Sequence, residues 1–191
     1  MRTPLPSYFT FLSGLPEPMG ELRLVSDGTA LTRIDFPPEP GSDQPPVPGQ
    51  RADDLPVLRT AAAELREYFA GRRTEFTVPL ALAGTPFQQA VWAELGRIPY
   101  GATWSYAELA RRIGNPQARR AVGAANGRNP VPIIVPCHRV IGTGGSLTGY
   151  GGGLPRKQQL LALEQRTQSP ARPLSLFAEA APGRQPASGR W

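Results

Sequence analysis

The chain has 191 residues, of which 21 are Gly and 23 are Pro, about 23 % of the total against the ~12 % usual for these two types. Part of it is therefore expected to be loop or tail, while 40 % hydrophobic residues are enough for one or two compact domains of ~100 residues. No stretch approaches the ~18 to 20 apolar residues of a membrane-spanning helix, and the apolar run at 8–12 is too short for a secretory signal. We expect a soluble, cytoplasmic protein without membrane contact.

The chain has one Cys, Cys137, and one His, His138. A single Cys excludes an intrachain disulfide, and this pair alone cannot supply the four ligands of a structural zinc site. The sequence therefore motivates no metal site.

The net charge of +6 is distributed unevenly along the chain. Residues 1–84 carry 8 Arg against 11 Asp and Glu, a balance of −3, whereas residues 85–191 carry 13 Lys and Arg against 4 Glu, a balance of +9. Because cationic side chains displace counterions condensed on phosphates, the second half is predicted to bind a polyanion. Genomic bias is the alternative, since 20 of the 21 basic residues are Arg, but it does not by itself explain the asymmetry.

The first half is predicted to form a small α/β domain over residues 1–84. Apolar residues on both sides of Asp27-Gly28 predict a β-hairpin over 19–36. A Pro-rich loop over 37–54 follows, because Pro cannot pair within a central strand. Apolar residues at steps of three and four then predict an amphipathic helix from Leu55 that stops at Gly71, and a strand is predicted over Glu75 to Leu82.

The second half is predicted to be mainly helical over 85–166. Thr85-Pro86 combines an N-cap with Pro at the first helical position, and a buried stripe follows it. Ser105 and Glu108 predict a capping box at the start of a short helix. Gly114 ends that helix and Asn115-Pro116 begins another at once, so residues 105–126 have the layout of a helix-turn-helix.

The second helix of this pair has an unusual surface. Arg119 and Arg120 stand at its start, and the residues that follow leave it nearly bare: Ala121, Gly123, Ala124, Ala125 and Gly127. A core helix packed tightly against its neighbours would also use small residues. The positive charge of this half favours contact with nucleic acid.

Residues 133–135 are apolar and lie between prolines, so they are predicted to form a short buried extended segment that ends at Cys137. A Gly-rich loop follows, in which Tyr150 is the one large side chain, and its shape is set by the backbone. A last helix is predicted from Pro155 to about Arg166, and residues 167–191 are predicted to be a flexible tail.

Cys137 and His138 are adjacent, and a thiol becomes a useful nucleophile only as the thiolate, which a nearby imidazole can generate. For the pair alone, a buried apolar Cys and a polar core His are the simpler interpretation. Glu164 adds to the case, because it shares one face of the last helix with Lys157 and two Leu, where a carboxylate is costly unless paired. Glu164 could orient the imidazole, or form a salt bridge with Lys157 or Arg139.

The run Pro136-Cys137-His138-Arg139-Val140 resembles the active-site signature of the O6-alkylguanine-DNA alkyltransferases, repair proteins that move an alkyl group from damaged guanine to their own cysteine. Similar segments occur in the family's order from about Thr85 to Glu164: Ser105-Tyr106, residues 120–123, residues 126–135, Gly149-Tyr150 and residues 152–154. The resemblance implies a small ribonuclease H-like α/β domain followed by a helical domain with a winged-helix-like helix-turn-helix. Support before Thr85 is weaker.

The resemblance also implies roles for individual residues. Cys137 would accept the alkyl group, His138 would act through a water as its base, and Glu164 would hold His138. Asn129 would orient the active-site loop. Tyr106 would donate a proton to the departing guanine and help to rotate the nucleotide.

For DNA binding, the resemblance implies that Arg120 enters the duplex through the minor groove and fills the space of a flipped-out base. Extrusion is required because the target oxygen lies inside the base stack. The Val140 carbonyl and the backbone of Tyr150 and Gly151 would read the extruded guanine, and the Tyr150 side chain would line its pocket. The remaining implied DNA contacts are Ser105, Ala121, Gly123 and Arg128.

Two departures concern the substrate and the metal. Gly151 stands where some members carry Ser, so a hydroxyl contact to guanine is lost, and the zinc site of some animal members cannot form here. Activity on O4-alkylthymine and the preferred alkyl size stay open.

The tail segment Leu174–Phe177 resembles the bacterial sliding-clamp binding peptide, although Ala171 occupies the place of its usual Gln. We expect a monomer. The alternatives to alkyl transfer are a non-catalytic sensor of alkylated DNA, whose relatives lack the signature cysteine, and a helix-turn-helix transcription factor, for which no effector domain is evident.

Overall fold

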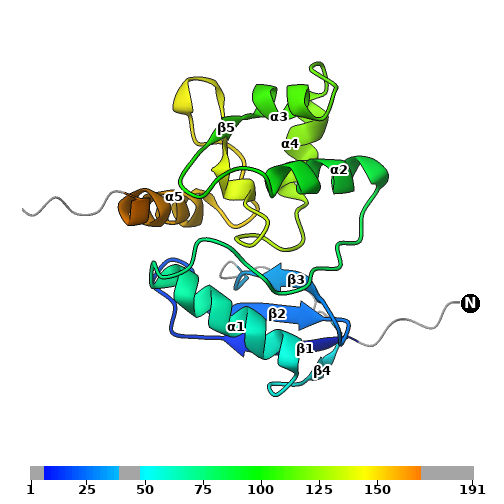
Figure 1. Ribbon diagram of the computed structural model, residues 1–191, viewed down its shortest axis with the longest axis vertical. Coiled ribbons are helices and arrows are strands. Elements are labelled where there is room, and N and C mark those ends of the chain that lie inside the picture. The colour runs from blue at the N-terminus through cyan, green and yellow to red at the C-terminus, as the bar shows by residue number, and fades with distance from the viewer. Residues whose placement is uncertain (1–6, 39–47, 169–191) are drawn as a thin grey trace, which may run out of the picture.

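The computed structural model describes residues 7–38 and 48–168. Figure 1 shows two domains. The lower domain consists of a small sheet and one long helix, and the upper domain is a group of shorter helices. Helix α5 (Leu154–Gln168) lies at one side, along the boundary between them. No helix among these residues is long and apolar enough to cross a membrane.

The N-terminal domain is a four-stranded sheet in the order β3-β2-β1-β4, covered on one face by helix α1 (Pro56–Phe69). Strands β1 (Tyr8–Leu12), β2 (Leu22–Ser26) and β3 (Leu31–Asp35) pair antiparallel. The predicted hairpin is confirmed, although its loop spans residues 27–30 rather than two residues. The predicted helix is also confirmed, and its apolar stripe packs on the sheet: Leu58, Ala61, Ala62, Leu65 and Tyr68 are all buried.

Three predictions in this domain need correction or addition. Residues 75–82 form no strand but one parallel bridge between Leu31 and Leu80, because Pro79 lacks a donor and Glu64 takes the amide hydrogens of Thr77 and Val78. The 37–54 segment is not loop throughout, because β4 (Gln50–Arg51) pairs parallel with the edge of β1. Strand β1 was not predicted at all.

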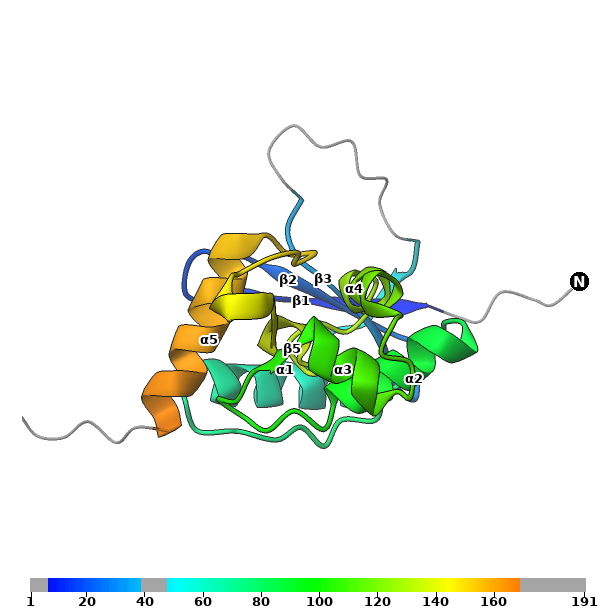
Figure 2. The same ribbon diagram turned by 90° about the horizontal axis from the view of Figure 1, so that it is seen from above.

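The C-terminal domain contains α2 (Pro86–Leu95), α3 (Tyr106–Arg112) and α4 (Arg119–Gly127), which pack on one another around Val91, Leu95, Leu109 and Val122. A two-stranded parallel sheet joins β5 (Trp104–Ser105) to β6 (Val140–Ile141). Figure 2 shows these helices lying over the sheet of the N-terminal domain.

The helix starts follow local capping chemistry. Thr85 and Gln88 form a reciprocal capping box at α2. At α3 only half of the predicted box forms: Ser105 Oγ accepts from the Glu108 amide, but the Glu108 carboxylate turns to Arg111 and Arg112. Helix α4 begins at Arg119, three residues after the predicted start at Pro116.

The segment before Cys137 is a turn, not the predicted extended strand. The Val135 amide donates to the Val131 carbonyl (3.0 Å), and buried Ile133 has a φ of +76°, a conformation that is costly for a β-branched residue. Flanking prolines block helix but do not enforce extension, and the surrounding core decides the outcome.

The two domains share one apolar core. Tyr100, Val131, Ile133 and Leu160 pack with the buried side chains of the sheet and α1. The Ile34 amide also donates to the Pro130 carbonyl (2.9 Å). Residues from the N-terminal domain therefore lie directly beside the segment that leads to Cys137.

Candidate active site

Cys137 begins a single 3-10 turn (η1, Cys137–Arg139) directly after Pro136, and its side chain is only 4 % exposed. Asn129 holds the preceding turn at both ends: its Nδ2 donates to the Val135 carbonyl (2.7 Å) and its Oδ1 accepts from the Val131 amide (3.0 Å). The Asn129 side chain also lowers the pKa of the thiol, so it lies close to the Cys137 sulfur. The residue predicted to orient this loop thus contacts both the loop and the nucleophile.

The pKa of the Cys137 thiol is set by its burial. Desolvation raises it to about 11, and the contributions of Asn129 and of the nearby Lys157 cation, which favour the thiolate, do not compensate. At neutral pH the thiol is therefore protonated, and nucleophilic attack requires a base.

His138 is fully buried and its Nε2 lies 2.8 Å from Glu164 Oε1. Burial lowers the pKa of His138, although Glu164 acts in the opposite direction. The ring is therefore neutral at pH 7. Because Glu164 is ionised, Nε2 carries the hydrogen and Nδ1 is the acceptor, and Nδ1 has no hydrogen-bond partner among the described residues.

Glu164, also fully buried, accepts hydrogen bonds on both oxygens. Arg139 binds it in a bidentate manner, with Nε on Oε2 and Nη2 on Oε1 (both 2.9 Å), and the Gly101 amide donates to Oε2 (2.9 Å). Burial opposes ionisation of Glu164, but the hydrogen bonds from His138 and Arg139 outweigh it and lower its pKa to about 2. The two roles considered for Glu164, orienting His138 and pairing with Arg139, occur together.

Lys157 does not pair with Glu164. Its buried Nζ donates to the carbonyls of Val140 (2.6 Å) and Thr148 (2.9 Å), and burial lowers its pKa. Lys157 therefore ties β6 to the Gly-rich loop.

A cavity of about 240 Å³ has Cys137 in its wall. Tyr150, Gly151 and Gly152 of the Gly-rich loop line it, as predicted for the first two, and Phe36 of the N-terminal domain closes it. The rings of Phe36 and Tyr150 meet edge to face at 6.0 Å. A Cβ at Gly152 would lie 2.6 Å from the Phe36 ring, so only Gly fits there.

Tyr106, the first residue of α3, connects the helix-turn-helix with the Gly-rich loop. Its hydroxyl donates to the carbonyls of Thr148 (3.2 Å) or Gly149 (3.3 Å), and burial raises its pKa, so it keeps its proton at neutral pH. It also faces Gly123 of α4, where a Cβ would lie 3.7 Å from its ring.

The outer face of α4 is exposed and basic at its start. Arg119, Arg120, Ala121, Ala124 and Arg128 are exposed, while Val122 and Ala125 are buried against α2 and α3. Asn126 is also buried, and its Nδ2 donates to the Cys137 carbonyl (3.4 Å). Trp92 fixes the helix from behind, because its indole Nε1 donates to the Ala125 carbonyl (2.9 Å). The small residues thus serve both close packing and a bare outer surface.

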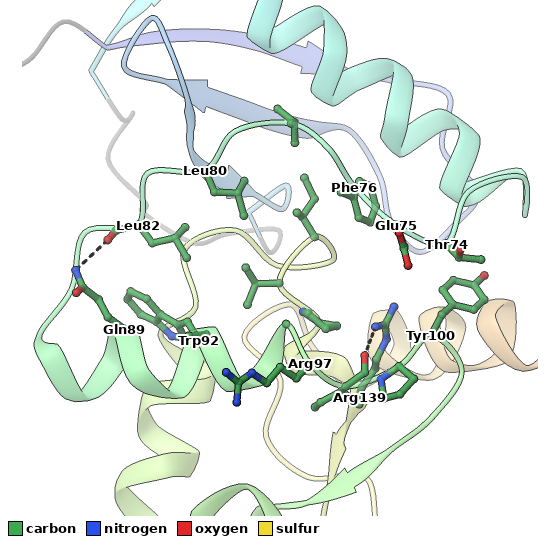
Figure 3. Close-up of a pocket in the computed structure, with 18 residues that line it drawn as sticks. Thr74, Glu75, Phe76, Leu80, Leu82, Gln89, Trp92, Arg97, Tyr100 and Arg139 are labelled. Carbon is green, nitrogen blue, oxygen red and sulfur yellow. Dashed lines mark hydrogen bonds between the residues drawn. The ribbon is translucent and has the colours of Figure 1, made fainter. Parts of the chain in front are cut away.

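A larger cleft, of about 830 Å³, lies on the other side of the Cys137 segment between residues 74–82 and α2 (Figure 3). Arg139 reaches its floor, where Nη1 donates to the Ile98 carbonyl (2.6 Å). No thiol or imidazole lines this cleft. The smaller cavity beside Cys137 is therefore the candidate active site despite its size.

Two side chains of the N-terminal domain contribute to the site and were not predicted from the sequence. Tyr68 of α1 donates its hydroxyl to Glu164 Oε1 (2.7 Å), and Phe36 closes the cavity. Tyr68 belongs to an ordinary amphipathic stripe and Phe36 directly follows a hairpin strand, so no sequence signal distinguishes either from a core residue.

Two family models match the chain. The DNA binding domain of 6-O-methylguanine DNA methyltransferase matches residues 86–166, and the ribonuclease-like domain of the same protein matches residues 12–82.

Curated relatives and solved structures agree with these matches. The methylated-DNA–protein-cysteine methyltransferase of Mycolicibacterium paratuberculosis is 62 % identical over 162 residues, which are 84 % of this chain and 94 % of the relative. That of Haemophilus influenzae is 45 % identical over 83 % of this chain and 86 % of the relative. A crystal structure of Mycobacterium tuberculosis OGT in complex with DNA superposes with a TM-score of 0.73 at 46 % identity, covering 84 % of this chain and 94 % of that one.

Proposed function

The chain belongs to the O6-methylguanine DNA methyltransferase family, and from this premise we propose that it repairs DNA by moving the alkyl group of O6-alkylguanine directly to Cys137. The observation that carries the proposal is a buried thiol in the wall of a cavity, followed in the chain by a histidine that Glu164 holds. A thioether is a poor leaving group, so each molecule acts once. The reaction uses no cofactor.

The first step removes the proton from Cys137. His138 is the base, since its Nδ1 is the free acceptor of a neutral ring. One water between Sγ and Nδ1 would carry the proton. The ionised Glu164 carboxylate then stabilises the imidazolium that forms.

In the second step the thiolate sulfur attacks the alkyl carbon, a C–S bond forms and the bond from carbon to O6 breaks. The electron pair of that bond stays on the guanine, which takes up one proton. Tyr106, which keeps its proton at neutral pH, would donate that proton as the guanine departs, and the His138 imidazolium would return a proton to the Tyr106 phenolate. The products are S-alkylcysteine and unmodified guanine.

The target base must leave the duplex to reach the buried thiol. We assign this to α4, whose exposed Arg120 would enter through the minor groove and occupy the vacated space, while its small outer residues let the backbone approach. Ala121 and Gly123 belong to this surface, and Ser105 and Arg128 flank it. The helix's basic start supports phosphate contact.

The extruded guanine would lie in the cavity beside Cys137. The backbone of Tyr150 and Gly151, which line the cavity, would recognise the guanine. Val140 does not line the cavity, and its carbonyl accepts from Lys157, so its implied contact with the guanine amine would use the second lone pair of that carbonyl. Asn129 would hold the turn before Cys137 and so keep the thiol directed at this pocket.

The experiment is intact-protein mass spectrometry after mixing with duplex DNA that contains one O6-methylguanine. We expect one added methyl group on the wild-type chain and none on Cys137→Ala, which should still bind the lesion. Tight binding without a mass change would favour the damage sensor. Strong sequence preference in footprints on undamaged DNA would instead favour a transcription factor.

The sliding-clamp segment, Leu174–Phe177, lies outside the described residues. Clamp binding stays a prediction, which a pull-down comparing the wild-type chain with a Leu176→Ala, Phe177→Ala double variant would test. Equal recovery of both would contradict it. The monomeric state and the cytoplasmic location also stay predictions, to be checked by light scattering and by cell fractionation.

A further inference from the structure

A tyrosine of the N-terminal domain reaches the proposed catalytic network. Tyr68, in the last turn of α1, donates its hydroxyl hydrogen to Glu164 Oε1 at 2.7 Å, across 96 positions of sequence. The bond is buried on both sides, since neither residue has exposed surface. Through this hydrogen bond, a side chain of the N-terminal domain contacts Glu164 of the C-terminal domain.

The surroundings of Tyr68 fix both its position and its protonation. Its ring packs edge to face on Tyr100 (6.0 Å) and Phe69 (5.4 Å) and against Phe76 (5.5 Å). Burial and the neighbouring Glu164 charge raise the pKa of Tyr68 well above its usual range, so the hydroxyl stays a donor. An aromatic cluster therefore holds a neutral donor against the carboxylate.

Three donors share Glu164 Oε1: His138 Nε2, Arg139 Nη2 and the Tyr68 hydroxyl. The hydroxyl hydrogen carries partial positive charge and lies beside the imidazole N–H on the same oxygen. The hydroxyl hydrogen therefore repels the positive charge that His138 gains on accepting a proton. It also reduces the negative charge with which Oε1 stabilises the imidazolium, so both effects lower the pKa of His138. In a buried site this effect is not screened by water.

We propose that Tyr68 is a positioning residue of the alkyl-transfer site, which fixes the Glu164 carboxylate and limits the proton affinity of His138. The inference rests on the proposed function, in which His138 is the base. Burial already favours the neutral imidazole, and through this bond the N-terminal domain adds to that effect. The other charged or titratable groups that influence His138 are Glu164 and Lys157 of α5 and Arg139 of η1, and Cys137 precedes His138 in the chain.

The first test is a titration of His138 by NMR in the absence of DNA. His138 is the single histidine of the chain, so an untagged protein has one imidazole to follow. We expect Tyr68→Phe to raise the pKa of His138 by about 0.5 to 1 unit, the size of effect that one buried hydrogen bond can produce.

The matched control is Tyr100→Phe. It removes a hydroxyl from the same aromatic cluster, and that hydroxyl is buried without a hydrogen-bond partner among the described residues. We expect Tyr100→Phe to leave the pKa of His138 unchanged. A rescue variant with 4-aminophenylalanine at position 68 keeps an N–H donor and should return the titration towards that of the wild type.

The second test measures single-turnover alkyl transfer from pH 5.5 to 8.5. The rate of Tyr68→Phe relative to wild type should be lower at pH 5.5 than at pH 8.5, because the variant's His138 becomes protonated at a higher pH than that of the wild type. A purely structural defect would lower the rate equally at every pH.

Equal His138 titrations in Tyr68→Phe and wild type, or a rate ratio that does not change with pH, would overturn the role of Tyr68. Failure of the wild-type chain to transfer an alkyl group would overturn the proposed function instead, and the NMR titration would still report on the Tyr68 bond.

Discussion

The two domains differ in composition and in what they contribute to the site. The N-terminal domain is acidic and packs a sheet on one helix, whereas the C-terminal domain is basic and carries the thiol, the imidazole and the carboxylate. Yet Tyr68 binds Glu164 and Phe36 closes the cavity, both from the N-terminal side. One domain therefore holds the reactive groups, while the geometry around these groups depends on both domains.

The largest effect should come from a change at Glu164, the buried carboxylate of the C-terminal domain. Glu164→Gln leaves the Arg139 guanidinium buried without its counter-charge, so we expect a loss of about 3 to 5 kcal/mol in the free energy of unfolding, measured by urea denaturation at pH 7. The N-terminal control is Glu67→Gln, which breaks a half-exposed ion pair with Arg73 and should cost less than about 1 kcal/mol.

The difference in the free energy of unfolding between wild type and Glu164→Gln should depend on pH in a definite direction. The folded-state pKa of Glu164 is lowered to about 2 from an ordinary 4.5, so its ionisation stabilises the fold above pH 4.5. This stabilisation is lost as the pH falls towards 2. The gap between wild type and Glu164→Gln should therefore narrow below pH 4.5, and a gap that stays constant would contradict the ionised pair.

A smaller effect is expected at the surface of the C-terminal domain. Arg120→Ala should slow repair of duplex DNA by about 10- to 100-fold, because base extrusion costs a few kcal/mol, and should change the reaction with free O6-alkylguanine less than about twofold. Arg72→Ala, an exposed arginine of the N-terminal domain, is the control and should leave both rates unchanged. Equal losses on the two substrates would remove Arg120 from base extrusion.

The smallest effect should come from the N-terminal wall of the cavity. Phe36→Ala removes the ring that closes the pocket against Tyr150, so transfer of a benzyl group should rise by about threefold to tenfold relative to a methyl group. Competition between the two substrates measures this ratio. Phe11→Ala, which removes a phenyl ring of the same domain outside that cavity, should not change it, and an unchanged ratio in Phe36→Ala would show that the wall does not limit alkyl size.

Much of the fold follows from local rules. The α2 start at Thr85 and Pro86, the hairpin and the apolar stripe of α1 depend on contacts within a few residues, which is why sequence patterns predict them. The 75–82 segment was predicted wrongly because its outcome depends on Glu64, which takes its amide hydrogens. The turn at 131–135 depends likewise on the core that holds Ile133 at positive φ.

The same division holds for the candidate site. Cys137 and His138 are neighbours in the chain, and helical spacing alone places Glu164 on the buried face of α5, so the sequence determined the reactive groups. Only the tertiary structure decided that Arg139 and Tyr68 would share Glu164, and that Phe36 and Cys137 would line the same cavity. These contacts join residues far apart in the chain, and a buried carboxylate takes whichever donors the packing of both domains brings within 3 Å.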